Sequence, residues 1–248
     1  MEAILDADAG DGVVVLPNLG HQLSKENDMN ISAIVLAAGN GKRMGADIPK
    51  QFLKIDGEYI LTKTLRVFQE SSVISDIVLV TGEEWIDFCH DEIVGKEGFS
   101  KVRHIITGGK ERYDSSYAGI LQCPNSDYVF IHDAARPYIT EEILIRTAEE
   151  VQKHLAVAVG VPSKDTIKIV DDDGFVTDTP LRKNVWNIQT PQAFSYSLIR
   201  AAYEIMLEEG MQGITDDAMV VEASRLARVK LVMGAYTNIK ITTPDDLK

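Results

Sequence analysis

The sequence has little cysteine and no long apolar run. Its 248 residues include only two cysteines, Cys89 and Cys123, which lie far apart in the sequence. This excludes a disulfide framework and a cysteine-type zinc site, and it predicts two thiols in a reducing cytoplasm. No segment reaches the roughly 18 apolar residues of a membrane-spanning helix, and the N-terminus lacks the cationic start of a secretory signal. We therefore expect a cytoplasmic protein with no membrane partner.

Positive charge is also scarce. The chain has 25 Lys and Arg against 38 Asp and Glu, so its net charge is −13. This balance argues against nucleic acid as a partner, because a surface that coats an anionic polymer has to be basic. A local cluster of Lys and Arg then marks a candidate site for a small anionic substrate.

Several common catalytic motifs are missing as well. The sequence contains no Gly-x-Ser-x-Gly, no His pair at metal-binding spacing and no evident Cys–His nucleophile system. The absence favours a reaction that needs little covalent or acid–base help, such as attack of a phosphate oxygen on a nucleotide α-phosphate. The second pKa of a phosphate monoester is about 6, so this oxygen is already a nucleophile at neutral pH. The protein then has to align it and neutralise charge.

What the chain does contain is an alternation of short apolar strands with helices. This alternation predicts an α/β fold, a Rossmann-like and mostly parallel sheet with helices on both faces. The predicted strands are residues 31–37, 77–80, 102–106, 128–131, 156–161, 229–232 and 239–242; the predicted helices are residues 61–68, 85–94, 113–121, 141–154, 198–207 and 216–226.

Two segments depart from this rhythm. Residues 165–187 contain a turn at Asp171–Gly174 between two β-rich runs, which predicts an inserted β-hairpin arm over about residues 163–188. Residues 1–28 are interpreted as a flexible N-terminal extension before a single domain over 29–248, although the apolar patch at 13–16 could add an edge strand. Residues 242–247 are typical of a helix start, so we expect either a truncated product or a very short last helix.

The first strand runs into a glycine-rich, cationic loop within the segment 34–51. The loop is not a Walker A motif, because it lacks the pattern Gly-x-x-x-x-Gly-Lys-Ser/Thr. It is not a dinucleotide fingerprint either, because the third glycine position holds Met44. A lone Gly-x-Gly is also typical of an ordinary turn between strand and helix. Three cations around one loop of an acidic chain favour a triphosphate site, since glycines bring backbone N–H groups close to a ligand. The candidate residues are Ala37, Ala38, Gly39, Asn40, Gly41, Lys42, Arg43 and Lys50.

The fourth strand is followed by Asp133 and Arg136. Ligands of open α/β sheets bind at the carboxyl ends of the strands, so Asp133 should face the same crevice as Gly39. An aspartate there can hold the Mg²⁺ that a nucleoside triphosphate brings, and Arg136 could bind a second phosphate. A single aspartate at a strand end is equally typical of a cap or turn, and we interpret His132 as structural.

Further candidates follow other predicted elements. Gly109 and Lys110, with Ser115, could receive a base or ribose, although a tight turn before a helix explains the same pattern. Thr215 is better explained as the N-cap of the next helix. Lys240 lies in an apolar run and points either to solvent or into a site. Arg182 and Thr190 complete this group.

Taken together, these segments resemble the 2-C-methyl-D-erythritol 4-phosphate cytidylyltransferases of non-mevalonate isoprenoid synthesis. The resemblance rests on the motifs Ala37–Met44 with Pro49–Gln51, His132–Pro137, Thr190–Phe194, Thr215–Ala218 and Asn238–Thr242, in the right order from about residue 29 to 247. It implies a fold of the nucleotide-diphospho-sugar transferase type, CTP and a sugar-alcohol phosphate as substrates, Mg²⁺ or another divalent cation as cofactor, and a homodimer formed through the hairpin arm.

The resemblance also implies roles for individual residues. Arg43 and Lys50 would stabilise the transition state, and Arg182 and Lys240 would position the second substrate. The residues Ala37, Ala38, Gly39, Asn40, Gly41, Gly109, Lys110, Ser115 and Ala134 would bind the nucleotide. Asp133 would hold the metal and, with Arg136, Thr166, Thr190 and Thr215, would approach the alcohol phosphate.

Three alternatives stay open at this point. A ribitol 5-phosphate cytidylyltransferase has the same fold, but His132–Pro137 and Thr215–Ala218 favour the methylerythritol enzyme. A nucleotide-sensing protein that has lost the chemistry would keep the loop. An NAD-dependent oxidoreductase is disfavoured by the missing third glycine.

Overall fold

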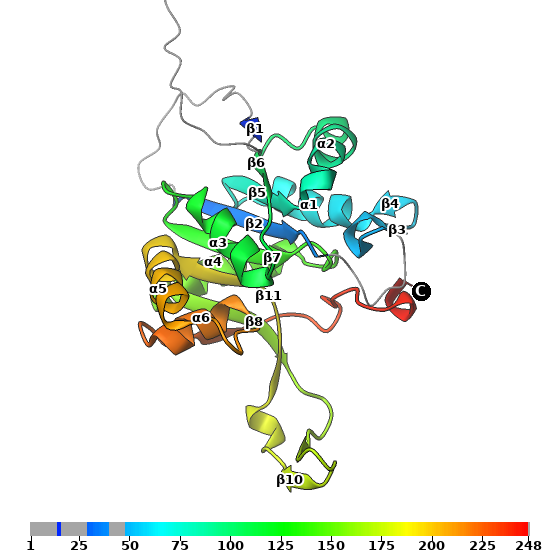
Figure 1. Cartoon of the computed structure of the whole chain (residues 1–248). Helices are drawn as coiled ribbons and strands as arrows, with labels where there is room; N and C mark the ends of the chain where they lie inside the picture. Colours follow the sequence, from blue (N-terminus) through cyan, green and yellow to red (C-terminus); the bar gives the residue numbers. More distant parts are fainter. Residues whose placement is uncertain (1–13, 16–28, 40–47, 248) are drawn as a thin grey trace, which may run out of the picture.

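The computed structural model describes residues 14–15, 29–39 and 48–247. Its centre is an eight-stranded sheet in the order β1-β6-β5-β2-β7-β11-β8-β12 (Figure 1). The pairings β6–β5, β5–β2, β2–β7 and β8–β12 are parallel, which confirms the mostly parallel α/β sheet. The strands are β1 (Val14–Val15), β2 (Ile31–Ala37), β5 (Asp76–Thr81), β6 (Val102–Thr107), β7 (Tyr128–Asp133), β8 (Ala156–Pro162), β11 (Trp186–Ser195) and β12 (Lys230–Met233).

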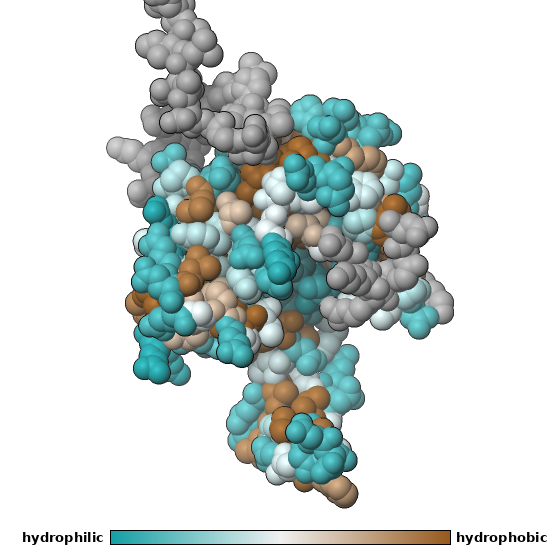
Figure 2. Space-filling view, viewed as in Figure 1, coloured by the Kyte–Doolittle hydropathy of each residue, from teal (hydrophilic) through white to brown (hydrophobic). Residues whose placement is uncertain are grey.

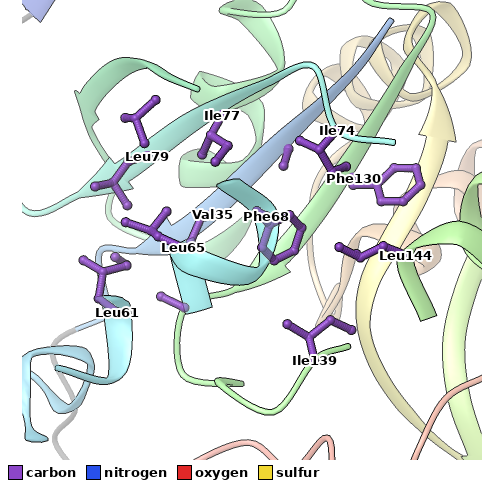
Figure 3. Close-up of a cluster of buried hydrophobic side chains, with 14 of the residues drawn as sticks. Val35, Leu61, Leu65, Phe68, Ile74, Ile77, Leu79, Phe130, Ile139 and Leu144 are labelled. Atoms are coloured by element: carbon purple, nitrogen blue, oxygen red, sulfur yellow. The ribbon is translucent and has the colours of Figure 1, made fainter. Parts of the chain in front are cut away.

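Helices cover both faces of this sheet. They are α1 (Ile60–Glu70), α2 (Ile86–Phe88), α3 (Arg112–Leu121), α4 (Glu141–His154), α5 (Tyr196–Glu209) and α6 (Asp217–Ser224), with a π-helical turn at Cys89–Gly95. Side chains alternate between the faces along β2. Val35 packs with α1 and α4, a cluster that Figure 3 draws, and Ile34 packs with α3 and α5 on the other face. Each fully buried Leu or Phe there contributes roughly 1.5–3 kcal/mol by leaving water.

One central strand was not predicted from the sequence. Strand β11 lies between β7 and β8 and is antiparallel to both. Its sequence reads as a loop because it contains Pro191 among polar residues, and proline cannot donate to a strand ladder. The ladder with β8 is interrupted between Ile188 and Gln192, which is where Pro191 lies.

The predicted strand at 239–242 is wrong. These residues form neither a helix nor a strand and pair with none of the described strands. Their backbone binds elsewhere: Ile241 N donates to Ala135 O at 2.8 Å. The chain then ends its described part in a short 3-10 turn, Pro244–Leu247.

The predicted hairpin arm and edge strand are both present. In the arm, β9 (Ile169–Val170) pairs antiparallel with β10 (Val176–Asp178), and the arm projects away from the sheet (Figure 1). Strand β1 adds an antiparallel edge next to β6, as the apolar patch suggested. A small hairpin, β3 (Lys54–Ile55) and β4 (Glu58–Tyr59), lies near the last turn of the described chain.

None of the helices in the described residues is long and apolar enough to cross a membrane. The predicted helix at 216–226 ends earlier, at Ser224, because Arg225 adopts a left-handed conformation with φ 60°. The predicted helix at 85–94 is present as a 3-10 turn, the short α2 and a π-helical turn in succession.

Candidate active site

A cavity of about 720 Å³ opens at the carboxyl ends of four neighbouring parallel strands, β2, β5, β6 and β7. The prediction that Asp133 and Gly39 face one crevice is confirmed. Eight of the candidate residues line this cavity, namely Ala38, Gly39, Lys50, Gly109, Lys110, Ser115, Asp133 and Lys240. The candidates Asn40, Gly41, Lys42 and Arg43 lie outside the described residues.

The entrance to the glycine loop is fixed by the segment that follows it. Gln51, from the 3-10 turn Lys50–Phe52, is buried, and its amide Nε2 donates to the carbonyls of Ala37 and Gly39. Lys50 reaches across to the C-terminal segment, where its Nζ donates to Ile241 O at 2.8 Å. These contacts place a cation beside the loop and fix the loop's first carbonyls through Gln51, which also lines the cavity.

Asp133 is the centre of a charge cluster on the cavity wall. Lys240 Nζ lies 2.8 Å from its Oδ2, Arg112 Nε lies 3.4 Å from Oδ1, and Arg136 Nε lies 3.6 Å from Oδ2. Burial would raise the pKa of Asp133, but Arg112, Lys240 and Arg136 outweigh it and hold that pKa far below its usual range. The carboxylate is therefore ionised at every working pH.

Arg112 connects this cluster to the protein interior. Its Nη1 lies 2.7 Å from Oδ2 of Asp217, a carboxylate with no exposed surface, and Tyr203 donates to the other oxygen, Oδ1, at 2.7 Å. Burial and then Asp217 raise the pKa of Tyr203 well above its usual value, so the phenol keeps its proton and stays a donor. Both oxygens of Asp217 are thereby occupied.

His132 and Thr190 hold the backbone on either side of Asp133. Thr190 Oγ1 accepts from Asp133 N at 3.1 Å and lies 3.0 Å from His132 Nδ1, and His132 Nε2 lies 3.2 Å from Arg136 O. Burial lowers the pKa of His132 to about 4, so the ring is neutral at pH 7. Nε2 then carries the proton, since it faces a carbonyl, and Nδ1 accepts the hydroxyl proton of Thr190. The interpretation of His132 as structural fits this network.

Replacing Thr190 by valine should lower the free energy of unfolding by about 1–3 kcal/mol. The change keeps the side-chain shape but leaves His132 Nδ1 and Asp133 N buried without a partner. Urea unfolding measures the difference. Serine at this position keeps the hydroxyl and should restore most of the loss, whereas equal losses for valine and serine would assign the effect to packing of the methyl group.

Several candidate residues lie outside the cavity. Thr166 and Arg182 are exposed on the arm, where Arg182 Nη1 donates to Lys164 O at 3.4 Å. Ala37 and Ala134 are buried behind the wall, and Ala134 N donates to Leu36 O. The guanidinium of Arg136 donates to the carbonyl of Asn238 at 2.9 Å, so it anchors the C-terminal segment.

Thr215 is not the N-cap that the sequence predicted. Asp216 is the cap of α6, and its Oδ1 accepts from Met219 N at 2.9 Å. Its Oδ2 accepts from Gln192 Nε2, which draws the helix onto β11. A carboxylate accepts more strongly than a hydroxyl at a helix N-terminus, because it also interacts with the helix dipole. Thr215 is exposed, and its hydroxyl contacts Met219 Sδ.

The sequence did not single out Arg112, Gln51 or Asp217. Arg112 belongs to the glycine motif after β6, but its partner Asp217 lies 105 positions later in the chain. No local pattern marks a pairing at that separation. Gln51 stands beside Lys50 in the sequence, and its position directly after the loop is the one signal that could have indicated it.

The chain resembles known proteins over nearly all of its described length. Residues 31–248 match the family model of 2-C-methyl-D-erythritol 4-phosphate cytidylyltransferase. The enzyme of that name from Lachnospira eligens is 46% identical over 218 residues, which cover 88% of this chain and 96% of the relative. The one from Geotalea uraniireducens is 48% identical over 223 residues, covering 88% and 94%.

Solved structures agree with the sequence relatives. A 4-diphosphocytidyl-2C-methyl-D-erythritol synthase from Anaerococcus prevotii superposes with a TM-score of 0.79 at 38% identity, covering 89% of this chain and 93% of the other. The 2-C-methyl-D-erythritol 4-phosphate cytidylyltransferase of Francisella tularensis gives a TM-score of 0.72 at 29% identity, covering 88% and 96%. With these matches and the cavity at the strand ends, the chain belongs to the family of 2-C-methyl-D-erythritol 4-phosphate cytidylyltransferases.

Proposed function

We propose that this chain transfers the cytidylyl group of CTP to 2-C-methyl-D-erythritol 4-phosphate in the synthesis of isoprenoid precursors. The products are 4-diphosphocytidyl-2-C-methyl-D-erythritol and pyrophosphate. The observation that carries the proposal is the charge cluster at Asp133, where one ionised carboxylate and three cations meet on the wall of a cavity next to a glycine loop. Such a wall can orient two phosphate-bearing substrates against each other.

The chemistry asks little of the protein beyond alignment and charge. An oxygen of the alcohol phosphate attacks the α-phosphorus of CTP, a new P–O bond forms, and the bond to the β-phosphate oxygen breaks as pyrophosphate leaves. Lys50 and Arg43 would neutralise charge that develops on the transferred phosphoryl group. Lys240, which lines the cavity beside Asp133, would bind the phosphate of the attacking alcohol.

The nucleotide half of the site is assigned to the two glycine motifs. The loop at 37–41 would follow the triphosphate with its backbone N–H groups. Gly109, Lys110 and Ser115 would surround the cytidine, and Ala134 would lie beneath it. A Cβ on Gly108 would collide with Ala38 Cβ and Ser115 Oγ, and one on Gly109 would collide with Asp114. Both positions of this loop therefore need glycine to pack against Ala38 and the start of α3.

Asp133 is the residue that would hold a divalent cation. Its carboxylate lines the cavity and stays ionised, as an oxygen ligand of Mg²⁺ must. The described residues contain no group of three or more His, Cys, Asp or Glu side chains that could cage a metal. This donor set fits an ion that arrives with its nucleotide, since Mg²⁺ commonly takes one or two carboxylates and completes its shell with substrate phosphates and water. Bound there, the ion would supply charge neutralisation to the triphosphate.

The arm is proposed to form a homodimer and to bring Thr166 and Arg182 to the partner's cavity as contacts to the alcohol phosphate. Its apolar side chains are unusually exposed for a single chain: Phe175 is 72% exposed and Leu181 66%, and brown patches mark the arm in Figure 2. Exposed apolar side chains on a projecting hairpin are typical of an interface. We place the dimer in the cytoplasm, with no nucleic acid or membrane among its partners.

The proposal is tested by offering CTP with each of two alcohol phosphates and measuring pyrophosphate release. Turnover is expected with methylerythritol phosphate, and little with ribitol 5-phosphate at the same concentration. Turnover with ribitol 5-phosphate alone would assign the chain to wall-polymer precursor synthesis. The resemblance also implies contacts of Thr190 and Thr215 with the alcohol phosphate, although neither residue lines this cavity.

Replacing Lys50 by alanine should lower kcat by about 10²-fold or more, because one preorganised cation at the transferred phosphoryl group is lost. The matched control is Lys54→Ala, four residues later, whose Nζ lies over the ring of Tyr59 outside the cavity. Steady-state pyrophosphate release measures both variants. A Lys50→Ala variant as active as Lys54→Ala would show that this cation has no part in the reaction, whereas a wild-type chain that binds CTP without releasing pyrophosphate would indicate a nucleotide-sensing protein.

A further inference from the structure

Arg112 is shared by two carboxylates, and the contacts are unequal. Its Nη1 lies 2.7 Å from Asp217 Oδ2, whereas its Nε lies 3.4 Å from Asp133 Oδ1. Asp217 therefore sets the direction of the guanidinium, and Asp133 receives only a loose contact. Since the guanidinium is a rigid fork, fixing one arm fixes where the others point.

Asp217 is in turn held in place by a hydrogen bond from the protein interior. Tyr203, on α5, donates to Asp217 Oδ1, and the Tyr203 ring stacks on Tyr117 of α3 with centroids 5.5 Å apart. Arg112 is the first residue of α3, the helix that carries Tyr117. The stacked tyrosines therefore connect the helix of Arg112 with the residue that binds Asp217. Both tyrosines belong to the apolar cluster between α3, α5 and α6, on the side of the sheet away from α1.

We propose that Asp217 and Tyr203 are positioning residues for Asp133, because they hold Arg112 back from closing on that carboxylate. Without Asp217, Arg112 would turn its fork toward Asp133 and close on Oδ1, since Lys240 and Arg136 already contact Oδ2. Asp133 would then be masked from the ligands of the cavity. The inference rests on the proposed function only in taking CTP as the ligand.

The test uses two neighbouring aspartates of one helix. Asp217→Asn keeps the shape and removes the charge that competes for Arg112. Asp216→Asn makes the same change one residue earlier, where the side chain caps α6 and binds Gln192 but not Arg112. CTP binding by calorimetry without the second substrate, and turnover with it, are measured for both variants. Asp217→Asn should weaken CTP binding and kcat/KM for CTP about tenfold, and Asp216→Asn by less than twofold.

A double-mutant cycle separates positioning from a merely structural role. If Asp217 acts through Arg112, then Arg112→Ala with Asp217→Asn should be no worse than Arg112→Ala alone. Losses that multiply in the double variant would overturn the proposal, and so would CTP binding by Asp217→Asn equal to that of Asp216→Asn. Tyr203→Phe removes one hydrogen bond and keeps the ring, so it gives the same test with a smaller loss if Asp217→Asn fails to fold. Turnover of the wild-type chain with CTP tests the proposed function separately.

Discussion

Asparagine in place of Asp133 is expected to lower kcat/KM for CTP by about 10³-fold. The change keeps the size of the side chain and removes the negative charge that Arg112, Lys240 and Arg136 share. Two functions are lost together: the oxygen ligand proposed for the divalent cation, and the anion that orders the surrounding cations. Pyrophosphate release at saturating alcohol phosphate measures the effect.

A matched control lies at the other end of the same strand. Asp127, just before β7, accepts a hydrogen bond from Asn30 N and does not line the cavity. Asp127→Asn should therefore keep near-normal kcat/KM. If both variants were equally active, the charge cluster would have no part in the reaction, and the assignment of Asp133 would fail.

The Asp133→Asn variant should also show a loss of stability that depends on pH. The pKa of Asp133 is lower in the folded chain than its ordinary value near 3.8, so its ion pairs stabilise the fold fully above that value and progressively less below it. Asp133→Asn should cost about 3–5 kcal/mol in unfolding free energy at pH 7, as breaking a buried pair does. The difference from the wild type should narrow as the pH falls below about 4, which urea unfolding at several pH values will measure.

How far the sequence predicts this fold depends on where each strand lies. Strands β2, β5, β7 and β8 are buried on both faces, so their apolar runs are nearly continuous and easy to recognise. Strand β11 is equally buried near Gln192, but its polar groups are satisfied by distant partners such as Asp216. Nothing in a local window distinguishes such a strand from a loop.

The apolar run around Ile241 gives the opposite error, since it predicts a strand where none is present. Ile241 is buried in a small cluster with Ile55 and Ile60 and not in the sheet. The segment is held at both ends, Asn238 to Thr190 O and Thr242 to Asp246, and it carries Lys240 to the cavity. Its apolar residues predict a buried strand, but only Ile241 is buried, Ile239 is 39% exposed, and the segment pairs with none of the described strands.

The residues of the candidate site also differ in how well the sequence predicts them. Residues at strand ends, such as Gly39 and Asp133, can be predicted to converge because parallel strands end at one edge. Arg112 and Asp217 cannot, since their pairing is set by how α3 and α6 pack on the sheet. Thr190 was placed near the substrate from the resemblance alone, and the structure gives its hydroxyl a role in holding Asp133.

Deleting residues 168–176 should give a monomer with little activity, if the arm completes the partner's site. The deletion removes the turn and the exposed Phe175, so the apolar surface that the dimer would bury is lost. Light scattering after size exclusion gives the mass, and pyrophosphate release gives the activity. An active monomer would show that the arm is only a surface hairpin.

Mixing two inactive variants tests the exchange of Arg182 more directly. In a mixed dimer of Arg182→Ala and Lys240→Ala, one cavity would combine the intact Lys240 of its own chain with the intact Arg182 of the partner. The other cavity would lack both. Random exchange makes half of the dimers mixed, so about a quarter of wild-type activity should return, because each mixed dimer holds one complete site. If Arg182 served its own chain, each cavity of a mixed dimer would lack one of the two cations, and mixing would restore nothing.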